Sequence, residues 1–404
     1  MTIHARTMIA VSALALAACA GGTAAAPDAA EEGRAAAEVA TAAEAEAQTS
    51  TGARYTDGSP QIAPAILARY APAPSTSKTI DYTLIDEALD LMVFNSGPSL
   101  RRRQRRPDAL SGTRFVRGHV SPYRLEGNKV FFSQFDDDVI RAIGEYRQSL
   151  ESIGASGRVQ SLPRNEQLAY WYNLHNFVVI DEIAKDYPVK VPRRMKVGPA
   201  GEGFHDAKVI ALGDDRLSLR DVREIVYTHW SDPVVMYGFY LGDLGGPSVR
   251  SEAYTGAGVT DDLDRQAREF VNALRGVSRG GGRLYVSEFY EEGRPHFFPD
   301  WPSDIRAHLA EYADEEVAAL LAEDREVRYG QYQDRVADMA GGEVFSDLGN
   351  RGALGTGSAV PPTMVRMVSE YREKLDELRE EGYLKPKVII IDVPTDDPAD
   401  AEVE

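Results

Sequence analysis

The sequence predicts a helix-rich α+β fold. Apolar residues recur at helical spacing over several long segments, whereas the strand-like segments are short and bounded by turn residues. In a central segment, about residues 163–186, apolar and aromatic residues occupy every side of a helix. Such a helix is buried all round rather than on one face. We therefore expect a buried central helix with short strands and hairpins around it.

The first residues of the chain have the pattern of a secretory signal peptide. A short basic start precedes an apolar run from Met8 to Ala18, which is interrupted only by Ser12 and is too short to span a bilayer. Cys19 follows in the order Leu-Ala-Ala-Cys, which resembles the bacterial lipobox, where the cysteine is lipidated. An ordinary signal peptide with a chance cysteine is the alternative.

The expected location follows from this segment. Residues 1–18 are predicted to be removed, and Cys19 is predicted to carry acyl chains that anchor the mature protein stably in a membrane. By resemblance to lipoprotein sorting, Ala20 after the cysteine favours the outer membrane, facing the periplasm. We therefore expect a lipid-anchored protein of the cell envelope.

Composition divides the rest of the chain. Residues 19–76 are rich in Ala, Glu, Thr, Ser and Pro and cannot build a core, so we predict a disordered tether there. The main globular domain is expected over residues 77–335. A C-terminal helix and strand extension over 336–393 and an acidic tail over 394–404 are expected to follow it.

Local patterns place the elements within these parts. We expect helices at Asp81–Phe94, from Asp136 to about Leu150, and at Ser218–His229, Asp261–Arg275, Ser303–Asp324 and Pro362–Glu381. We expect strands at Lys208–Leu212, Arg283–Val286 and Val388–Ile391. A hairpin is predicted between Phe115-Val116 and Val130-Phe131-Phe132. Asp136-Asp137-Asp138 is interpreted as a helix start rather than a metal site, because carboxylates cap the free N–H groups there.

Charge and cysteine content exclude some functions. The net charge of −18 argues against a general nucleic-acid binder, which needs a positive surface. Cys19 is the only cysteine, so a cysteine-dependent mechanism is excluded in the folded domain. The histidines lack the spacing of a zinc site, and we expect no metal or cofactor.

A basic island, Arg101-Arg102-Arg103-Gln104-Arg105-Arg106, stands out in this acidic chain. It is interpreted either as a site for phosphate, lipopolysaccharide or an acidic partner, or as a solvated loop whose arginines pair with the protein's own carboxylates. The sequence leaves both interpretations open.

Polar residues on the central helix are candidates for a site. Glu166 and Asn173 are seven positions apart and share a face, and Asn176 lies next to that face. His175 points to roughly the opposite side. Glu166, Asn173 and Asn176 could therefore form one polar cluster, which is either a functional site or a structural network that fixes loops to the helix.

Three residues are candidates for a catalytic role: Glu166, His175 and His205. His205 follows the small-residue stretch Gly198–Gly203 and precedes Asp206, and a loop histidine beside an acid can act as a base. A surface turn is the alternative there. Ser248 follows Gly245-Gly246-Pro247 but lacks the Gly-x-Ser-x-Gly pattern of a nucleophile elbow, so we interpret that segment as a turn.

Arg164, Trp171, Asn173 and Asn176 form an arginine-containing start and a Trp-x-Asn-x-x-Asn core. With these residues the segment resembles the family known as domain of unknown function family 547. The resemblance spans about Leu162 to Asn272 and includes Leu217-Ser218-Leu219-Arg220-Asp221-Val222, Asp232-Pro233, Pro247 and Glu252-Ala253-Tyr254.

The chain also departs from this family. Glu224 and Met236 stand where typical members have histidine, and Leu241 and Gly246 stand where members often have cysteine. A histidine together with a cysteine is what a thiol nucleophile would need. The resemblance therefore implies that any thiol chemistry of typical members is lost here.

Two functions remain after these exclusions. The first is an envelope lipoprotein whose domain binds an unknown envelope partner or ligand without catalysis. It is favoured by the missing histidines and cysteines, the tether and the acidic tail. The alternative is a hydrolase-like enzyme with a non-thiol His/Glu/Asn site, which rests on the polar cluster of the central helix.

Overall fold

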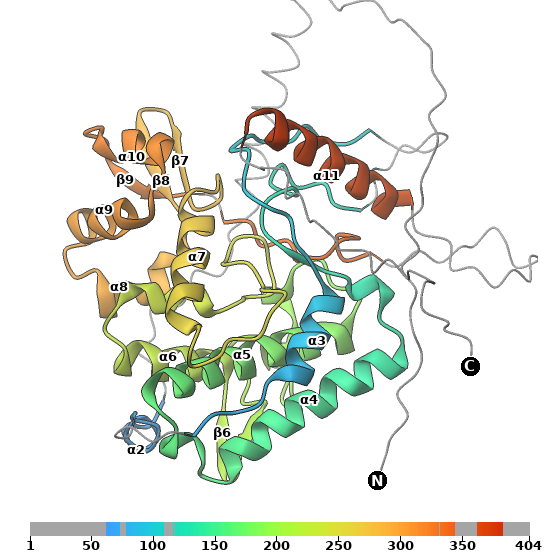
Figure 1. The fold of residues 1–404 in the computed structure, drawn as a ribbon, viewed down its shortest axis with the longest axis vertical. Helices are drawn as coiled ribbons and strands as arrows, with labels where there is room; N and C mark the ends of the chain where they lie inside the picture. The colour runs from blue at the N-terminus through green and yellow to red at the C-terminus, as the bar shows by residue number, and fades with distance from the viewer. Residues whose placement is uncertain are drawn as a thin grey trace, which may run out of the picture. The chain divides into compact units, whose positions relative to one another are not determined.

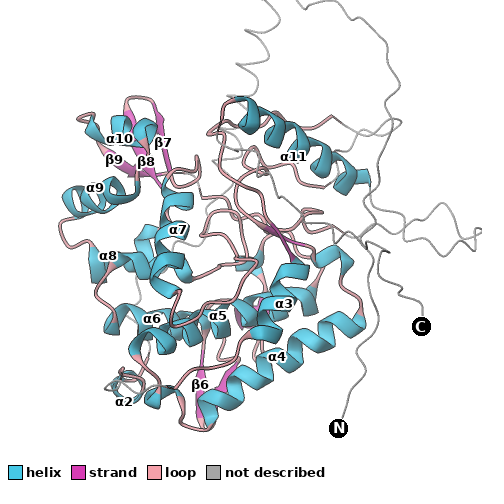
Figure 2. Ribbon diagram, viewed as in Figure 1, coloured by secondary structure: helices cyan, strands magenta, loops and turns pink. Residues whose placement is uncertain are grey.

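The structure, a computed structural model, describes residues 62–72, 78–108, 116, 118–330, 332–343 and 362–382. All of these residues lie in the second of two compact units, Asp57–Glu404. Helices dominate this unit and its strands are short, as Figure 2 shows. The predicted helix-rich α+β class is confirmed.

The helix α5, Arg164–Asp186, runs through the core (Figure 1). Every residue from Glu166 to Asp181 is buried, because apolar and aromatic side chains cover all sides of the helix. Three further helices contact it: α4 (Asp137–Ala155), α6 (Leu219–His229) and α7 (Val259–Val271). The predicted buried central helix is confirmed.

Side-chain caps fix the start of two of these helices. The Asp136 carboxylate accepts a hydrogen bond of 2.9 Å from the backbone N–H of Val139 at the start of α4. At the start of α6, Ser218 and Asp221 bond reciprocally to each other's backbone N–H groups. Each cap satisfies N–H groups that have no partner within the helix. The predicted helix starts at Asp136 and Ser218 are thus confirmed.

The predicted helix Ser303–Asp324 is two helices instead. They are α9, Trp301–Tyr312, and α10, Glu315–Ala322. Asp314 accepts a hydrogen bond of 2.9 Å from the backbone N–H of Val317 and so starts a new helix. The apolar periodicity on both sides of this cap conceals the break.

Short strands form antiparallel pairs and one three-stranded sheet. The pairs are β1–β2, β3–β4 and β5–β6, with bounds Val93–Phe94, Lys129–Val130, Lys196–Val197, Glu202–Gly203, Ile210–Leu212 and Asp215–Leu217. The three-stranded sheet contains β7 (Val277–Gly280), β8 (Arg283–Val286) and β9 (Val327–Tyr329). β8 lies in the middle, antiparallel to β7 and parallel to β9.

The predicted hairpin around Val116 and Val130 is wrong. β2 pairs with β1, so that Val93 lies opposite Val130. The helix α3, Thr83–Met92, leads directly into β1 and buries Val93 next to Val130. Val116 lies outside any strand, and Phe115 lies outside the described residues. An alternating pattern identifies a strand but not its partner.

Part of the predicted tether packs on the core. The helix α2, Pro64–Arg69, is flanked by Ile62 and Tyr70, which are both buried. The Tyr70 ring meets the Trp171 ring of α5 edge to face, with 5.2 Å between the centroids. The prediction of a tether over residues 19–76 is therefore wrong for 62–72. Two apolar anchors in a polar segment are too few to signal a core from composition.

Two more helices complete the described unit: α8 (Tyr290–Phe297) and α11 (Pro362–Glu380). The confirmed prediction of a helix near Pro362–Glu381 corresponds to α11. The predicted signal peptide, Cys19, the predicted strand Val388–Ile391 and the acidic tail over 394–404 lie outside the described residues.

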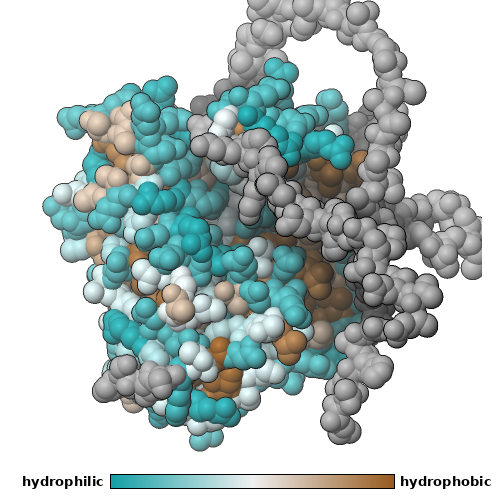
Figure 3. All heavy atoms as spheres, in the orientation of Figure 1, coloured by the Kyte–Doolittle hydropathy of each residue, from teal (hydrophilic) through white to brown (hydrophobic). Residues whose placement is uncertain are grey.

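The visible surface is mostly hydrophilic, with apolar residues gathered around α3 (Figure 3). Leu84 and Leu91 of α3 are exposed there. In the part of the chain that the structure describes, no helix combines the length and the hydropathy that a bilayer span requires.

Candidate functional site

The polar side chains of α5 bind backbone groups of three different loops. Glu166 accepts hydrogen bonds of 2.9 Å from the backbone N–H groups of Ile80 and Gly256. The Asn173 carboxamide bonds to both backbone groups of Tyr254, at 2.8 and 2.9 Å. Loops that cover α5 are thereby fixed to it by side chains of α5 itself.

Asn176 binds the loop that follows the short helix Pro233–Gly238. Its Nδ2 donates to the Gly238 carbonyl and its Oδ1 accepts from the Tyr240 N–H, both at 2.9 Å. Within the described residues, no hydrogen bond joins Asn176 to Asn173 or Glu166. The three side chains that were expected to form one polar cluster therefore make separate contacts with the backbone of loops.

His175 lies closer to Asn176 than the helical geometry suggested. Its Nδ1 is 3.1 Å from Asn176 Oδ1, and its Nε2 is 2.9 Å from a guanidinium nitrogen of Arg223. Among the described residues His175 makes no hydrogen bond to Glu166 or Asn173, and of the three polar residues it contacts the adjoining Asn176. Burial, with the positive charge of Arg223, holds the pKa of His175 well below its usual range. His175 is therefore a neutral, sealed group.

His205 is buried rather than on a surface turn. Its ring packs on Phe204, with 4.8 Å between the centroids. Asp206 does not orient it, because that carboxylate binds Arg220 at 2.6 Å. Burial and the nearby Arg223 hold the pKa of His205 well below its usual range. The structure thus brings His205 near His175 and Arg223, and does not join it to Glu166.

The arginines of the basic island have different environments, and these bear on the two interpretations of the segment. Arg101 binds Glu316 at 2.8 Å and donates to the carbonyls of Asn272 and Val277. Arg102 makes a bidentate pair with Glu377 of α11, at 2.7 and 2.8 Å. These two arginines are satisfied by the protein itself, as one interpretation expected.

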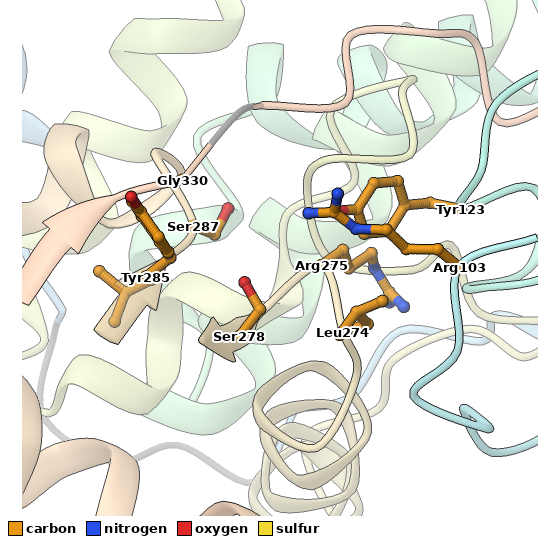
Figure 4. Close-up of a pocket in the computed structure, with 9 residues that line it drawn as sticks. Arg103, Tyr123, Leu274, Arg275, Ser278, Tyr285, Ser287 and Gly330 are labelled. Atoms are coloured by element: carbon orange, nitrogen blue, oxygen red, sulfur yellow. The ribbon is translucent and has the colours of Figure 1, made fainter. Parts of the chain in front are cut away.

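Arg103 has a different environment, because it lines a cavity of about 300 Å³ (Figure 4). The cavity lies between the β7–β8 sheet, the turn after α7 and the loops that carry Arg103 and Tyr123. The lining residues are Arg103, Tyr123, Leu274, Arg275, Ser278, Tyr285, Val286, Ser287 and Gly330. The wall that the sheet provides is held by backbone pairing, since β7 and β8 form a regular antiparallel ladder.

Arg275 closes one side of this cavity and is held by carboxylates. Its Nη2 binds Glu269 at 2.6 Å and Ser248 Oγ at 2.9 Å. Its backbone N–H donates to Glu126, which also accepts from the N–H of Leu274. Glu126 thus fixes the turn between α7 and β7 that presents Arg275.

Gly245 and Gly246 accept hydrogen bonds from two residues that line the cavity. Ser287 donates to the Gly245 carbonyl at 3.2 Å, and Arg275 Nε donates to the Gly246 carbonyl at 3.5 Å. Ser248 Oγ donates to Glu269 and accepts from Arg275, so it is engaged in a structural network. Gly246, the position at which members of the family often have cysteine, therefore contacts the side chain of a residue that lines the cavity.

Packed or paired side chains occupy the three other positions at which this chain departs from the family. Glu224 lies 3.1 Å from His296, and Met236 is fully buried against Gly293. Leu241 is buried in the core. Each replacement thus has a packing or pairing role in this chain.

A second depression, of about 500 Å³, lies beside α4 and α5. Its central Arg147 binds Glu151, Asp181 and Glu182 at 2.5–2.9 Å. The charges there neutralise one another, so this depression is a weaker candidate for a ligand site. Among the residues that the structure describes, no group of three or more His, Cys, Asp and Glu side chains could hold a metal ion.

The cavity was missed by the sequence interpretation. Arg103 was noted as part of the basic island, but Arg275, Ser278 and Ser287 carried no signal of their own. They meet Arg103 only because the turn after α7 and the β7–β8 sheet pack against the loop that carries it.

Comparisons with known proteins found no curated protein and no solved structure that matches this chain. A family model does match. Residues 159–271, from the turn before α5 to the end of α7, match the model described as protein of unknown function, DUF547, which confirms the resemblance seen in the sequence.

Proposed function

We propose that this protein is a lipid-anchored envelope lipoprotein whose domain binds a small ligand and does not catalyse a reaction. Cys19 is the lipid attachment site, and the outer membrane, facing the periplasm, is the location that the residues around Cys19 favour. The bound molecule is accommodated by the cavity between Arg103 and Arg275.

One observation supports binding over catalysis: among the residues that the structure describes, those that line the cavity include no Asp, Glu, His, Cys or Lys. General acid–base catalysis relies most often on His, Glu, Asp or Lys, and a serine nucleophile needs an adjacent base of this kind. The lining instead offers guanidinium and hydroxyl donors beside apolar surface. Such a mixture is typical of sites that bind and orient a small molecule.

The enzyme alternative gains no support from the geometry. Both oxygens of Glu166 accept hydrogen bonds from backbone N–H groups, and Asn173 and Asn176 bond to backbone as well. A base needs an acceptor that can reach a substrate proton. His175, which is fully buried against Arg223, has no such access.

Native mass spectrometry of the full-length lipoprotein, released from envelope membranes in mild detergent, tests the proposal. We expect a bound small molecule on the native protein. Ser278→Trp places a large ring in the cavity and is expected to abolish this binding. Ser149→Trp, on the exposed face of α4, is the matched control and is expected to retain it.

Two results would contradict the proposal. One is a native protein without a bound molecule, or a bound molecule that the Ser278→Trp variant retains. The other is chemical conversion of the released molecule on incubation with the protein, which would favour the enzyme alternative.

A further inference from the structure

We infer that the acidic tail, residues 394–404, binds the exposed arginines of the basic island in the same chain, Arg103, Arg105 and Arg106. This contact lies beyond the proposed function, because it is made within the protein and involves no small ligand. It follows from the unpaired arginines, from their course along α11 and from the length of chain between α11 and the tail.

The first argument is that part of the basic island lacks a counter-charge. Two of its arginines pair with carboxylates of the folded unit, as described above. Arg103, Arg105 and Arg106 are exposed, and within the described part of the chain none of the three forms an ion pair. Since the whole chain carries a net charge of −18, these arginines are a positive surface in an acidic protein.

The second argument is that the backbone of the island is fixed. Gln104 donates its backbone N–H to the Pro122 carbonyl at 2.7 Å, and the Arg105 carbonyl accepts a hydrogen bond of 2.8 Å from Arg124. Pro107, which follows the island, is buried. The arginine side chains therefore project from a backbone that is already in place, which lowers the entropy cost of binding.

The third argument is the course of the island along α11. Arg102 pairs with Glu377, near the end of this helix. Arg124, which holds the Arg105 carbonyl, pairs with Glu370, and this residue precedes Glu377 by about 10 Å along the helix axis. The island therefore runs back along α11, from the end of the helix toward its middle (Figure 1).

The chain that follows α11 is long enough to bring the tail to the island. Gly382, just after the helix, has a φ of 80°, the left-handed conformation in which helices commonly end. Asp396, the first carboxylate of the tail, follows Gly382 by 14 residues, which reach at most about 50 Å when extended. Glu370 lies about 18 Å from Gly382 along the helix. The island is therefore within reach of the tail.

The tail carries the charge that the island lacks. It contains no Lys or Arg and five carboxylates, those of Asp396, Asp397, Asp400, Glu402 and Glu404. A guanidinium group binds the two oxygens of a carboxylate in matching geometry. One exposed ion pair stabilises little, but a segment of the same chain is present at a high effective concentration. Several such pairs together hold the tail on the island at low ionic strength.

An anionic membrane would offer the island the same charge. The net charge of −18, however, repels the body of the protein from such a surface, whereas the tail needs no second molecule. The tail is therefore the favoured partner, and its binding withholds the arginines from other anions.

Modification of arginines by phenylglyoxal, mapped by mass spectrometry on the full-length protein in a neutral detergent, tests the inference. The variant to compare has amides in place of the tail carboxylates: Asp396→Asn, Asp397→Asn, Asp400→Asn, Glu402→Gln and Glu404→Gln. At low salt, Arg105 and Arg106 are expected to react at least about three-fold more slowly in the wild-type protein than in this variant, because the bound tail covers them. The difference is expected to vanish in about 1 M salt, where the Debye length is about 3 Å.

Two controls accompany this comparison. Arg216 is exposed and donates hydrogen bonds to carbonyls of its own hairpin, so it is expected to react equally in the wild-type protein and the tail variant. A matched variant removes five exposed carboxylates outside the tail and is expected to react like the wild-type protein at Arg105 and Arg106. Its substitutions are Glu145→Gln, Asp186→Asn, Glu202→Gln, Asp261→Asn and Asp300→Asn.

Four results would overturn the inference. Equal reaction of Arg105 and Arg106 in the wild-type protein and the tail variant would show that the tail does not cover them. The same acceleration in the matched variant would show a general effect of net charge. Protection that appears only on phosphatidylglycerol vesicles, and that the tail variant retains, would assign the island to anionic lipid. Protection that depends on protein concentration would assign the contact to the tail of a second copy.

Discussion

The carboxamide of Asn173 pairs with both backbone hydrogen-bonding groups of Tyr254: Oδ1 accepts from the N–H at 2.9 Å and Nδ2 donates to the carbonyl at 2.8 Å. The side chain thus satisfies a buried peptide unit in the way that a neighbouring strand would. This relationship indicates a structural use for a residue that the family resemblance singles out.

Asn173→Ala is expected to lower the free energy of unfolding by about 2–4 kcal/mol, because it leaves a buried N–H and a buried C=O without partners. Chemical denaturation monitored by circular dichroism measures this change. Gln148→Ala, at an exposed position of α4, is the control and is expected to change stability by less than about 0.5 kcal/mol. An Asn173→Ala variant as stable as the control would refute the structural role.

Gly256→Ala tests the contact between Glu166 and its loop. A Cβ at Gly256 would lie 2.3 Å from Glu166 Oε2 and 2.9 Å from the Glu166 backbone, so the loop must move away from α5. We expect a loss of about 1–3 kcal/mol of unfolding free energy.

Gly144→Ala is the matched control for this variant. It makes the same change within α4, where the nearest atom to the added Cβ is Asp181 Oδ1 at 3.8 Å. It is expected to stabilise the protein by about 0.5–1 kcal/mol, because alanine favours the helix. Thermal denaturation of both variants should therefore show shifts of opposite sign, and shifts of the same sign would contradict the account.

Two buried carboxyls predict how stability depends on pH. Burial raises the pKa of Asp243 to about 7, only partly offset by Arg193, and burial raises the pKa of Asp338 to about 6. An unfolded aspartate titrates near pH 4. Between about pH 4 and 7 these two carboxyls bind more protons in the native protein than in the unfolded chain, so their contribution to stability falls as the pH rises.

Asp243→Asn removes one of these titrations while keeping an acceptor for the Tyr332 hydroxyl, which binds Asp243 at 2.7 Å. The wild-type protein is expected to lose on the order of 4 kcal/mol from Asp243 over this pH range, and the variant to lose correspondingly less. Urea denaturation at several pH values measures both slopes. Parallel profiles for the two proteins would show that Asp243 does not carry this dependence.

Cys19→Ser tests the proposed membrane anchor. Cells fed a clickable fatty acid are expected to label the wild-type protein, and the variant to carry no label and to leave the membrane fraction, because the serine has no thiol to accept the lipid. Retention of the label by the variant would place the anchor elsewhere.

The sequence revealed those parts of the fold that local chemistry determines. The central helix was predictable because every side of its segment is apolar or aromatic, and Ser218 marked the start of α6 through its capping pattern. The break at Asp314 and the pairing of Val93 with Val130 were not predictable in this way. A cap inside a continuous apolar pattern is ambiguous, and strand partners are chosen by tertiary packing.

The candidate site was harder to predict for the same reason. Arg103 and Arg275 are far apart in the sequence and meet only when the turn after α7 packs against the basic island. The residues that the sequence marked most strongly, Glu166, Asn173 and Asn176, bind backbone instead. Buried polar residues on a helix have the same sequence pattern in both roles.

A structure of the full-length protein purified from envelope membranes tests the central claim most directly. The account predicts a bound small molecule in the cavity that Arg103, Tyr123 and Ser278 line. A cavity that is empty, or a small molecule bound elsewhere on the protein, would contradict it.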